Sequence, residues 1–89
     1  MLGTDTKGEA EAIALHALAW TLEEPDRAAR LLSVTGLTPH DLRARATEPS
    51  VLAACLEFLE AHEADLVACA GALEVPPPAL VRAREALER

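Results

Sequence analysis

The sequence has few of the residues that build β-sheets or disulfide frameworks. Its 89 residues include one tryptophan, one phenylalanine, no tyrosine and only two cysteines. β-Strands favour aromatic and β-branched residues, whereas alanine and leucine make up most of the apolar half of this chain. The composition therefore predicts an all-α protein, and the length predicts a single domain with one core.

Long hydrophobic runs are also missing. The longest, from Ala12 to Leu22, is interrupted by His16 and Thr21 and falls short of the roughly 18 residues of a membrane span. Residues 1–7 lack the basic start and apolar run of a secretion signal. We therefore expect no membrane association, a cytoplasmic location and free cysteine thiols in a reducing compartment.

Negative charge dominates, and it is unevenly distributed. The net charge is −7, with −5 over residues 1–26, +3 over 27–45, −6 over 46–75 and +1 over 76–89. An acidic chain repels a phosphate backbone, so binding of nucleic acid would depend on the arginines of the 27–45 segment alone.

Helical periodicity and proline punctuation predict a compact orthogonal bundle of five or six short helices. Residues 1–8 show no periodicity and are predicted to be a flexible tail before a single helical domain over residues 9–89. The first helix, from about 8 to 23, is apolar around most of its circumference, with one ridge formed by Leu15, Leu18 and Leu22, which makes it the central helix. Further helices are expected over about 27–35, 39–47, 50–75 and 78–87, and the segment 50–75 is compatible with one helix or two.

Several residues are suited to helix ends. Asp26 is predicted to cap the second helix, and Gly36 to end it in a left-handed conformation. Thr38, Pro39 and Asp41 then follow the pattern of a new helix start, with a cap, a first-turn proline and a carboxylate at the positive end of the helix dipole.

A weak repeat occurs at an offset of 38 residues. The segment 37–45 and the segment 75–84 each contain a proline followed by a leucine and then Arg-Ala-Arg. Two related helical hairpins and coincidental use of proline at helix starts both explain it.

Metal binding and catalysis find little support in the sequence. Cys55, His62 and Cys69 are seven residues apart, which on a continuous helix is about 10.5 Å per step and too far for one metal ion. Both cysteines lie in apolar stripes of an acidic segment, which raises the pKa of a thiol, and His16 and His40 occupy positions expected to be exposed. We therefore predict no metal, no cofactor and no enzymatic activity, with the cysteines acting as small core residues.

One edge of the first helix is the best candidate for a binding surface. It consists of Glu9, His16, Trp20 and Glu23. Tryptophan is common at the centre of interfaces, although the shortage of aromatic residues favours a core position for Trp20, covered by the last helix. Because the sequence predicts no catalytic or metal-binding residues, we expect an interaction or adaptor module that binds another protein. Homodimerisation is included, because spare apolar surface is often buried against a second copy.

The alternative function is DNA binding. Residues 27–47 resemble a helix-turn-helix segment, with Gly36 in the turn. The basic residues available to it are Arg27, Arg30, Arg43 and Arg45. The match is partial, because Leu32 stands where a small residue usually allows the two helices to approach.

Residues 9–20, EAEAIALHALAW, and 31–43, LLSVTGLTPHDLR, are the most distinctive segments, and the second contains the pattern Thr-Gly-Leu-x-Pro-x-x-Leu-Arg. Together they resemble a small alphaproteobacterial family of uncharacterised helical proteins, over nearly the whole chain. In that family a second Gly-Leu-x-Pro precedes the last helix, where this chain has Glu74-Val75-Pro76-Pro77. The resemblance implies a compact cytoplasmic bacterial domain and transfers no catalytic residue.

Overall fold

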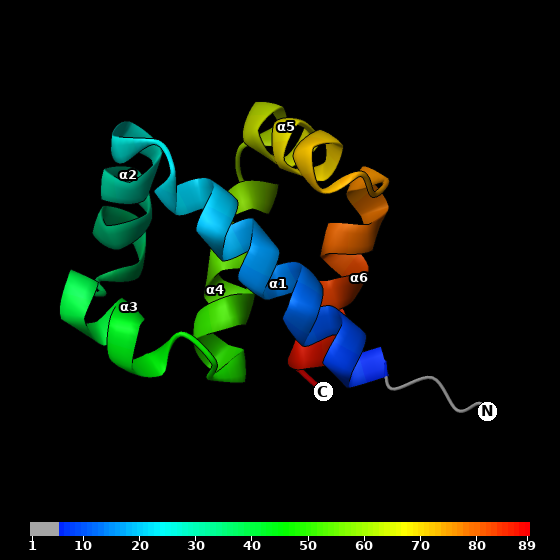
Figure 1. Cartoon of the computed structure of the whole chain (residues 1–89), viewed down its shortest axis with the longest axis horizontal. Coiled ribbons are helices and arrows are strands. Elements are labelled where there is room, and N and C mark those ends of the chain that lie inside the picture. The colour runs from blue at the N-terminus through cyan, green and yellow to red at the C-terminus, as the bar shows by residue number, and fades with distance from the viewer. Residues whose placement is uncertain (1–5) are drawn as a thin grey trace.

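Proline residues set where most of the helices begin. Pro25, Pro39, Pro49 and Pro77 each occupy the first position of a helix, where the missing amide proton costs nothing. The computed structural model describes residues 6–89, with side chains from Lys7 onward, and over that range it contains six α-helices and no strand (Figure 1). This confirms the all-α prediction. The helices are α1 (Thr6–Leu22), α2 (Pro25–Thr35), α3 (Pro39–Arg45), α4 (Pro49–Glu60), α5 (Glu63–Leu73) and α6 (Pro77–Leu87).

Helix α1 begins earlier than the sequence pattern indicates. It starts at Thr6, whereas we predicted a tail over residues 1–8. Residues 1–5 of that tail lie outside the described residues, and residues 6–8 belong to the helix.

The corner between α2 and α3 follows the predicted capping pattern. Gly36 ends α2 in the left-handed conformation, with φ 76°, and its N–H donates to the carbonyl of Leu32. The Thr38 hydroxyl accepts from the backbone N–H of Asp41 at 3.0 Å, and the Asp41 carboxylate accepts from the backbone N–H of Thr38 at 3.0 Å. These hydrogen bonds from Thr38, the backbone one foremost, hold the pKa of the Asp41 carboxyl below its usual value.

The prediction that Asp26 caps α2 is wrong. Glu24 is the capping residue, and its carboxylate accepts from the backbone N–H of Arg27 at 2.6 Å. Because Pro25 already takes the first helical position, Asp26 falls inside the first turn.

Residues 49–73 form two helices, which settles a choice that the sequence left open. α4 ends at Glu60, His62 is extended with φ −130° and ψ 92°, and α5 begins at Glu63. A continuous helix over this segment would be about 37 Å long and would carry its second half away from α1. The break at His62 lets both α4 and α5 pack against α1.

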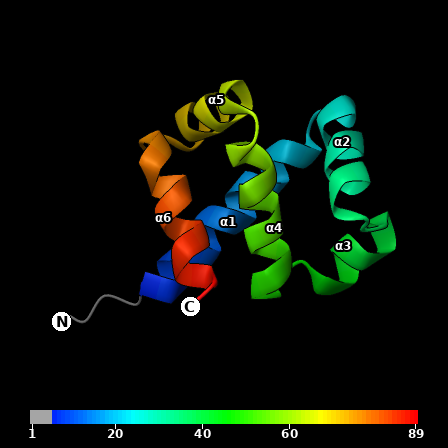
Figure 2. The same ribbon diagram turned by 180° about the vertical axis from the view of Figure 1, so that it is seen from behind.

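The alanines of α1 form the centre of the fold. Ala10, Ala14 and Ala17 are buried at helical spacing, and α1 packs most extensively against α6 and α4. Figure 1 shows α1 crossing these two helices, and Figure 2 shows them from the other side. Small side chains let helix axes approach closely. The facing side of the core is filled by leucines, namely Leu52, Leu56, Leu59, Leu80 and Leu87.

Helix α3 lies at the periphery of the fold, so the two halves of the weak sequence repeat have different surroundings. α3 buries only Leu42 and makes few contacts with the other helices, whereas α6 buries four residues and contacts α1, α4 and α5. The two proline-initiated segments therefore do not occupy equivalent places in the fold.

No single helix among residues 6–89 has both the length and the hydropathy of a membrane span. Only α5 and α6 taken together have that length and hydropathy, and the chain bends by 96° at the break between these two helices.

Two glycines allow a matched test of backbone conformation. A Cβ atom added at either Gly36 or Gly71 would meet no atom within 4 Å, so neither substitution creates a clash. Gly36→Ala should lower the free energy of unfolding by about 1 kcal/mol, because φ 76° disfavours a side chain. Gly71→Ala, inside α5, should raise it by about 0.5–1 kcal/mol, because alanine has the higher helix propensity. Urea denaturation measures both, and changes of the same sign would contradict this account.

Candidate functional site

Most of the predicted surface residues meet at one hollow beside α5. His16, Trp20 and Glu23 border an open hollow of about 390 Å³, and Ala19 of α1 lines it as well. The opposite side is formed by Ala72 and Leu73 of α5. The structure thus brings three of the four predicted residues together around an apolar floor with a histidine and a carboxylate at its rim.

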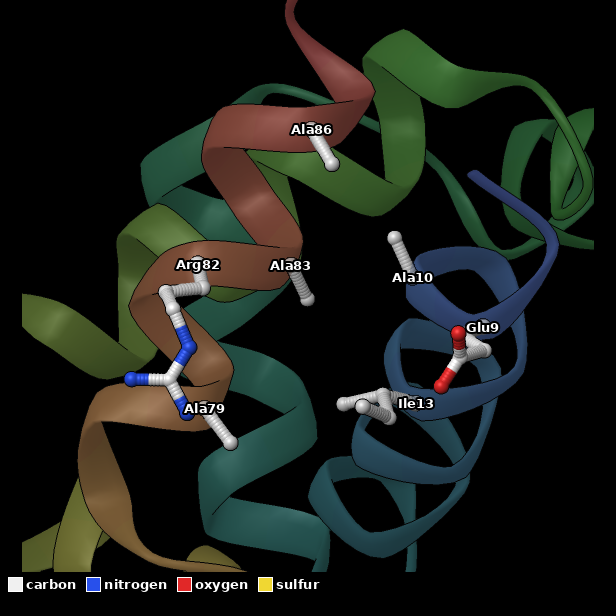
Figure 3. Close-up of a pocket in the computed structure, with 7 residues that line it drawn as sticks. All are labelled: Glu9, Ala10, Ile13, Ala79, Arg82, Ala83 and Ala86. Atoms are coloured by element: carbon white, nitrogen blue, oxygen red, sulfur yellow. The ribbon is translucent and has the colours of Figure 1, made fainter. Parts of the chain in front are cut away.

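Glu9 lies at a different place. It borders a groove of about 240 Å³ between the first turns of α1 and the helix α6 (Figure 3). Ala10 and Ile13 line the α1 side of this groove, and the α6 side is lined by Ala79, Arg82, Ala83 and Ala86. The four predicted residues therefore belong to two hollows along one edge of α1, and sequence reasoning did not single out Arg82.

The outer side of α1 is more apolar than we predicted. Leu15 and Leu22 are 37% and 41% exposed, and Ala12 and Ala19 on the same side are exposed too. We expected Leu15 and Leu22 to form a buried ridge with Leu18, but only Leu18 is buried. Because α1 is apolar on both sides, its periodicity could not show which side faces the core. We call Ala12, Leu15, Ala19 and Leu22 the outer stripe.

Trp20 is half-buried at the edge of the core and is held by Arg27. The Arg27 guanidinium carbon lies 3.7 Å from the centre of the indole ring, and its Nη2 donates to the carbonyl of Trp20 at 2.5 Å. Stacking of a guanidinium on an indole face is an attractive cation–π contact. The Nε atom of Arg27 is buried without a hydrogen-bond partner, which offsets part of this gain. Arg27 thus fixes the tryptophan that borders the α5 hollow.

Two further arginines proposed for DNA contact are also paired within the chain. Arg30 lies 3.4 Å from the carboxylate of Asp65, and Arg45 lies 3.0 Å from that of Glu48. Arg43 is exposed on α3, which ends at Arg45 rather than near residue 47. The segment 27–47 therefore presents a short second helix that is not packed closely on the first, unlike a recognition helix.

The two cysteines are buried, as the sequence predicts, and their thiols stay neutral. Burial raises the pKa of Cys55 to about 12 and that of Cys69 to about 11. The Thr21 hydroxyl lies 3.9 Å from the Cys55 sulfur and donates to the carbonyl of Ala17 at 2.8 Å. His62 is exposed at the α4–α5 turn, and the described residues contain no group of three side chains that could hold a metal ion.

Residues 7–89 match the model of a family described as "Protein of unknown function (DUF3572)". The chain belongs to the DUF3572 family. The match covers the six helices except for Thr6, in agreement with the expected likeness to an uncharacterised family. The search of curated proteins finds no match, and the search of solved structures finds none either.

The contact between Arg27 and Trp20 in this DUF3572 domain can be tested by truncation. Arg27→Ala should shift the emission of Trp20 to the red, because the indole face becomes exposed. It should also lower the free energy of unfolding by about 1–2 kcal/mol. Arg30→Ala is the matched control, since its ion pair with Asp65 lies at the surface, and it should change stability by less than about 1 kcal/mol. Equal spectra for Arg27→Ala and the parent protein would contradict the contact.

The buried thiols predict how stability depends on pH. Both pKa values are raised above the ordinary 9.0, so folding favours the neutral thiols. This contribution is intact below about pH 9 and is lost progressively as the pH rises from 9.0 through about 11 to 12. We expect the urea midpoint, followed by Trp20 emission, to fall over that range. The double variant Cys55→Ala, Cys69→Ala should show a shallower fall, and an equally steep one would assign the effect to other groups.

Proposed function

We propose that this domain is a protein-interaction module that binds a helix of another protein along the outer stripe of α1. The observation that carries the proposal is the exposure of Leu15 and Leu22 on the helix at the centre of the fold. Contiguous apolar surface on a small domain marks an interaction site more often than a scattered exposed residue does. A partner helix with apolar residues at three- and four-residue spacing would bury this stripe.

The charges beside the outer stripe favour a basic partner. Glu11 flanks it on one side and Glu23 on the other, and neither carboxylate has an ion pair or hydrogen bond within the described chain. Lys7, at the start of α1, is the only lysine or arginine of this helix. Complementary charges speed association and select partners. A helix with lysine or arginine beside its apolar face fits this surface.

The α5 hollow extends the proposed surface. His16, Trp20 and Glu23 lie along the edge of α1 next to the outer stripe, and Ala19 belongs to both. A large side chain of the partner could enter this hollow and contact the indole that Arg27 holds in place.

We do not favour the alternative function of DNA binding. Arg27, Arg30 and Arg45 are engaged within the chain, and the surrounding acidic segments remain. We also propose no catalytic step, since both thiols are neutral and buried. The free state of these thiols supports, as part of the proposal, a reducing cytoplasmic location.

Designed peptides test the proposed surface. An amphipathic helical peptide with leucines and flanking lysines should bind the domain and shift Trp20 emission to the blue, whereas the same peptide with glutamates in place of lysines should not bind. The double variant Leu15→Asp, Leu22→Asp should weaken binding at least about tenfold, because two leucine side chains no longer bury apolar surface.

The control for this experiment keeps the net charge equal. Val34→Asp, Val67→Asp adds the same two carboxylates at positions that are 68% and 50% exposed and lie on other helices. This variant should bind the basic peptide as tightly as the parent domain. Equal weakening by the two double variants would show that the loss of binding does not depend on the outer stripe and would refute the proposed surface.

A further inference from the structure

The groove between α1 and α6 combines a small-residue floor with opposite charges on its two sides. Ala10, Ala83 and Ala86 are 3%, 4% and 7% exposed, so the floor is formed by tightly packed helix backbones. Figure 3 shows Glu9 on the α1 side and Arg82 on the α6 side of this strip. A surface of this kind lets another helical surface approach closely and also sets its orientation.

Neither charge is satisfied within the chain. Glu9 and Arg82 are both exposed, and neither takes part in an ion pair or hydrogen bond among the described residues. The neighbouring Arg84 of α6 differs, since it lies 2.5 Å from the carboxylate of Glu60 and 2.7 Å from that of Glu88. Arg82 thus remains available for an external carboxylate, and Glu9 for an external cation.

We infer that this groove is the interface of a symmetric homodimer. A two-fold axis running along the groove lays α1 of each copy over α6 of the other. It therefore places Glu9 of each copy opposite Arg82 of the other copy, so the dimer contains two symmetry-related Glu9–Arg82 ion pairs. Figure 3 shows Ile13 across the groove from Ala79, and the same rotation sets each Ile13 over the Ala79 of the other copy.

Charge complementarity selects a second copy at the groove and not at the outer stripe. Two outer stripes facing each other would bring the flanking carboxylates Glu11 and Glu23 together with those of the other copy. The groove carries one charge of each sign and is complementary to itself. Each copy also carries a net charge of −7, which opposes association at long range, and at physiological salt this repulsion is screened beyond about 8 Å. The self-association is independent of partner binding at the outer stripe, and either can fail without the other.

Charge reversal with mixing tests the homodimer. Sedimentation velocity over a concentration series should show a monomer–dimer equilibrium for the parent protein. Glu9→Arg and Arg82→Glu alone should each raise the dissociation constant at least about tenfold, because like charges then face each other. An equimolar mixture of the two variants should recover dimers, since every contact between unlike variants is again between opposite charges. The double variant Glu9→Arg, Arg82→Glu should recover them as well.

The controls use the other unpaired charges of the C-terminal segment. Glu85→Arg and Arg89→Glu make the same changes in net charge outside the groove and should leave the dissociation constant unchanged. Circular dichroism checks the fold, and Glu9→Gln and Arg82→Gln give milder variants with smaller losses. A parent protein that stays monomeric, a dimer that survives both single reversals, or a mixture that remains monomeric would each overturn the inference.

Discussion

The close approach of α1 to α4 and α6 through Ala10, Ala14 and Ala17 is the constraint on which the rest of the structure depends. A chain with one phenylalanine and one tryptophan has few large side chains with which to fill space between distant helices. It reaches a dense core by bringing the backbones together and filling the remaining space with the leucines of α4 and α6. Because the alanines of α1 face α4 and α6, Leu15 and Leu22 lie on the solvent side of the helix. The packing that forms the core therefore also leaves apolar surface exposed.

The two surfaces along α1 differ in charge, and we therefore propose partner binding for one and self-association for the other. The outer stripe is flanked by carboxylates, whereas the α1–α6 groove carries Glu9 and Arg82 on opposite sides. A surface with one sign of charge selects a partner of the opposite sign, and a surface with both signs can select itself. In these two proposals one helix contributes to two contacts, one along the outer stripe and the α5 hollow and the other at the α1–α6 groove.

Features that depend on a few neighbouring residues were predictable from the sequence. The stop at Gly36 and the start at Thr38 and Pro39 need only local hydrogen bonds and φ preferences. Which side of α1 is buried was not predictable, because both sides are apolar and only packing against α4 and α6 selects the alanines. The break at His62 contains neither glycine nor proline and follows from the same packing. For the candidate site, the edge of α1 was visible as a helical pattern, but Ala72, Leu73 and Arg82 join it only through the placement of α5 and α6.

The corner between α2 and α3 explains the most distinctive sequence pattern of the chain. Within Thr-Gly-Leu-x-Pro-x-x-Leu-Arg, the glycine supplies a left-handed stop, the proline starts the next helix, and the second leucine, Leu42, is the buried anchor of α3. Each of these roles is complete without a ligand. The pattern is therefore explained by the backbone turn between α2 and α3, and it assigns no ligand to this segment.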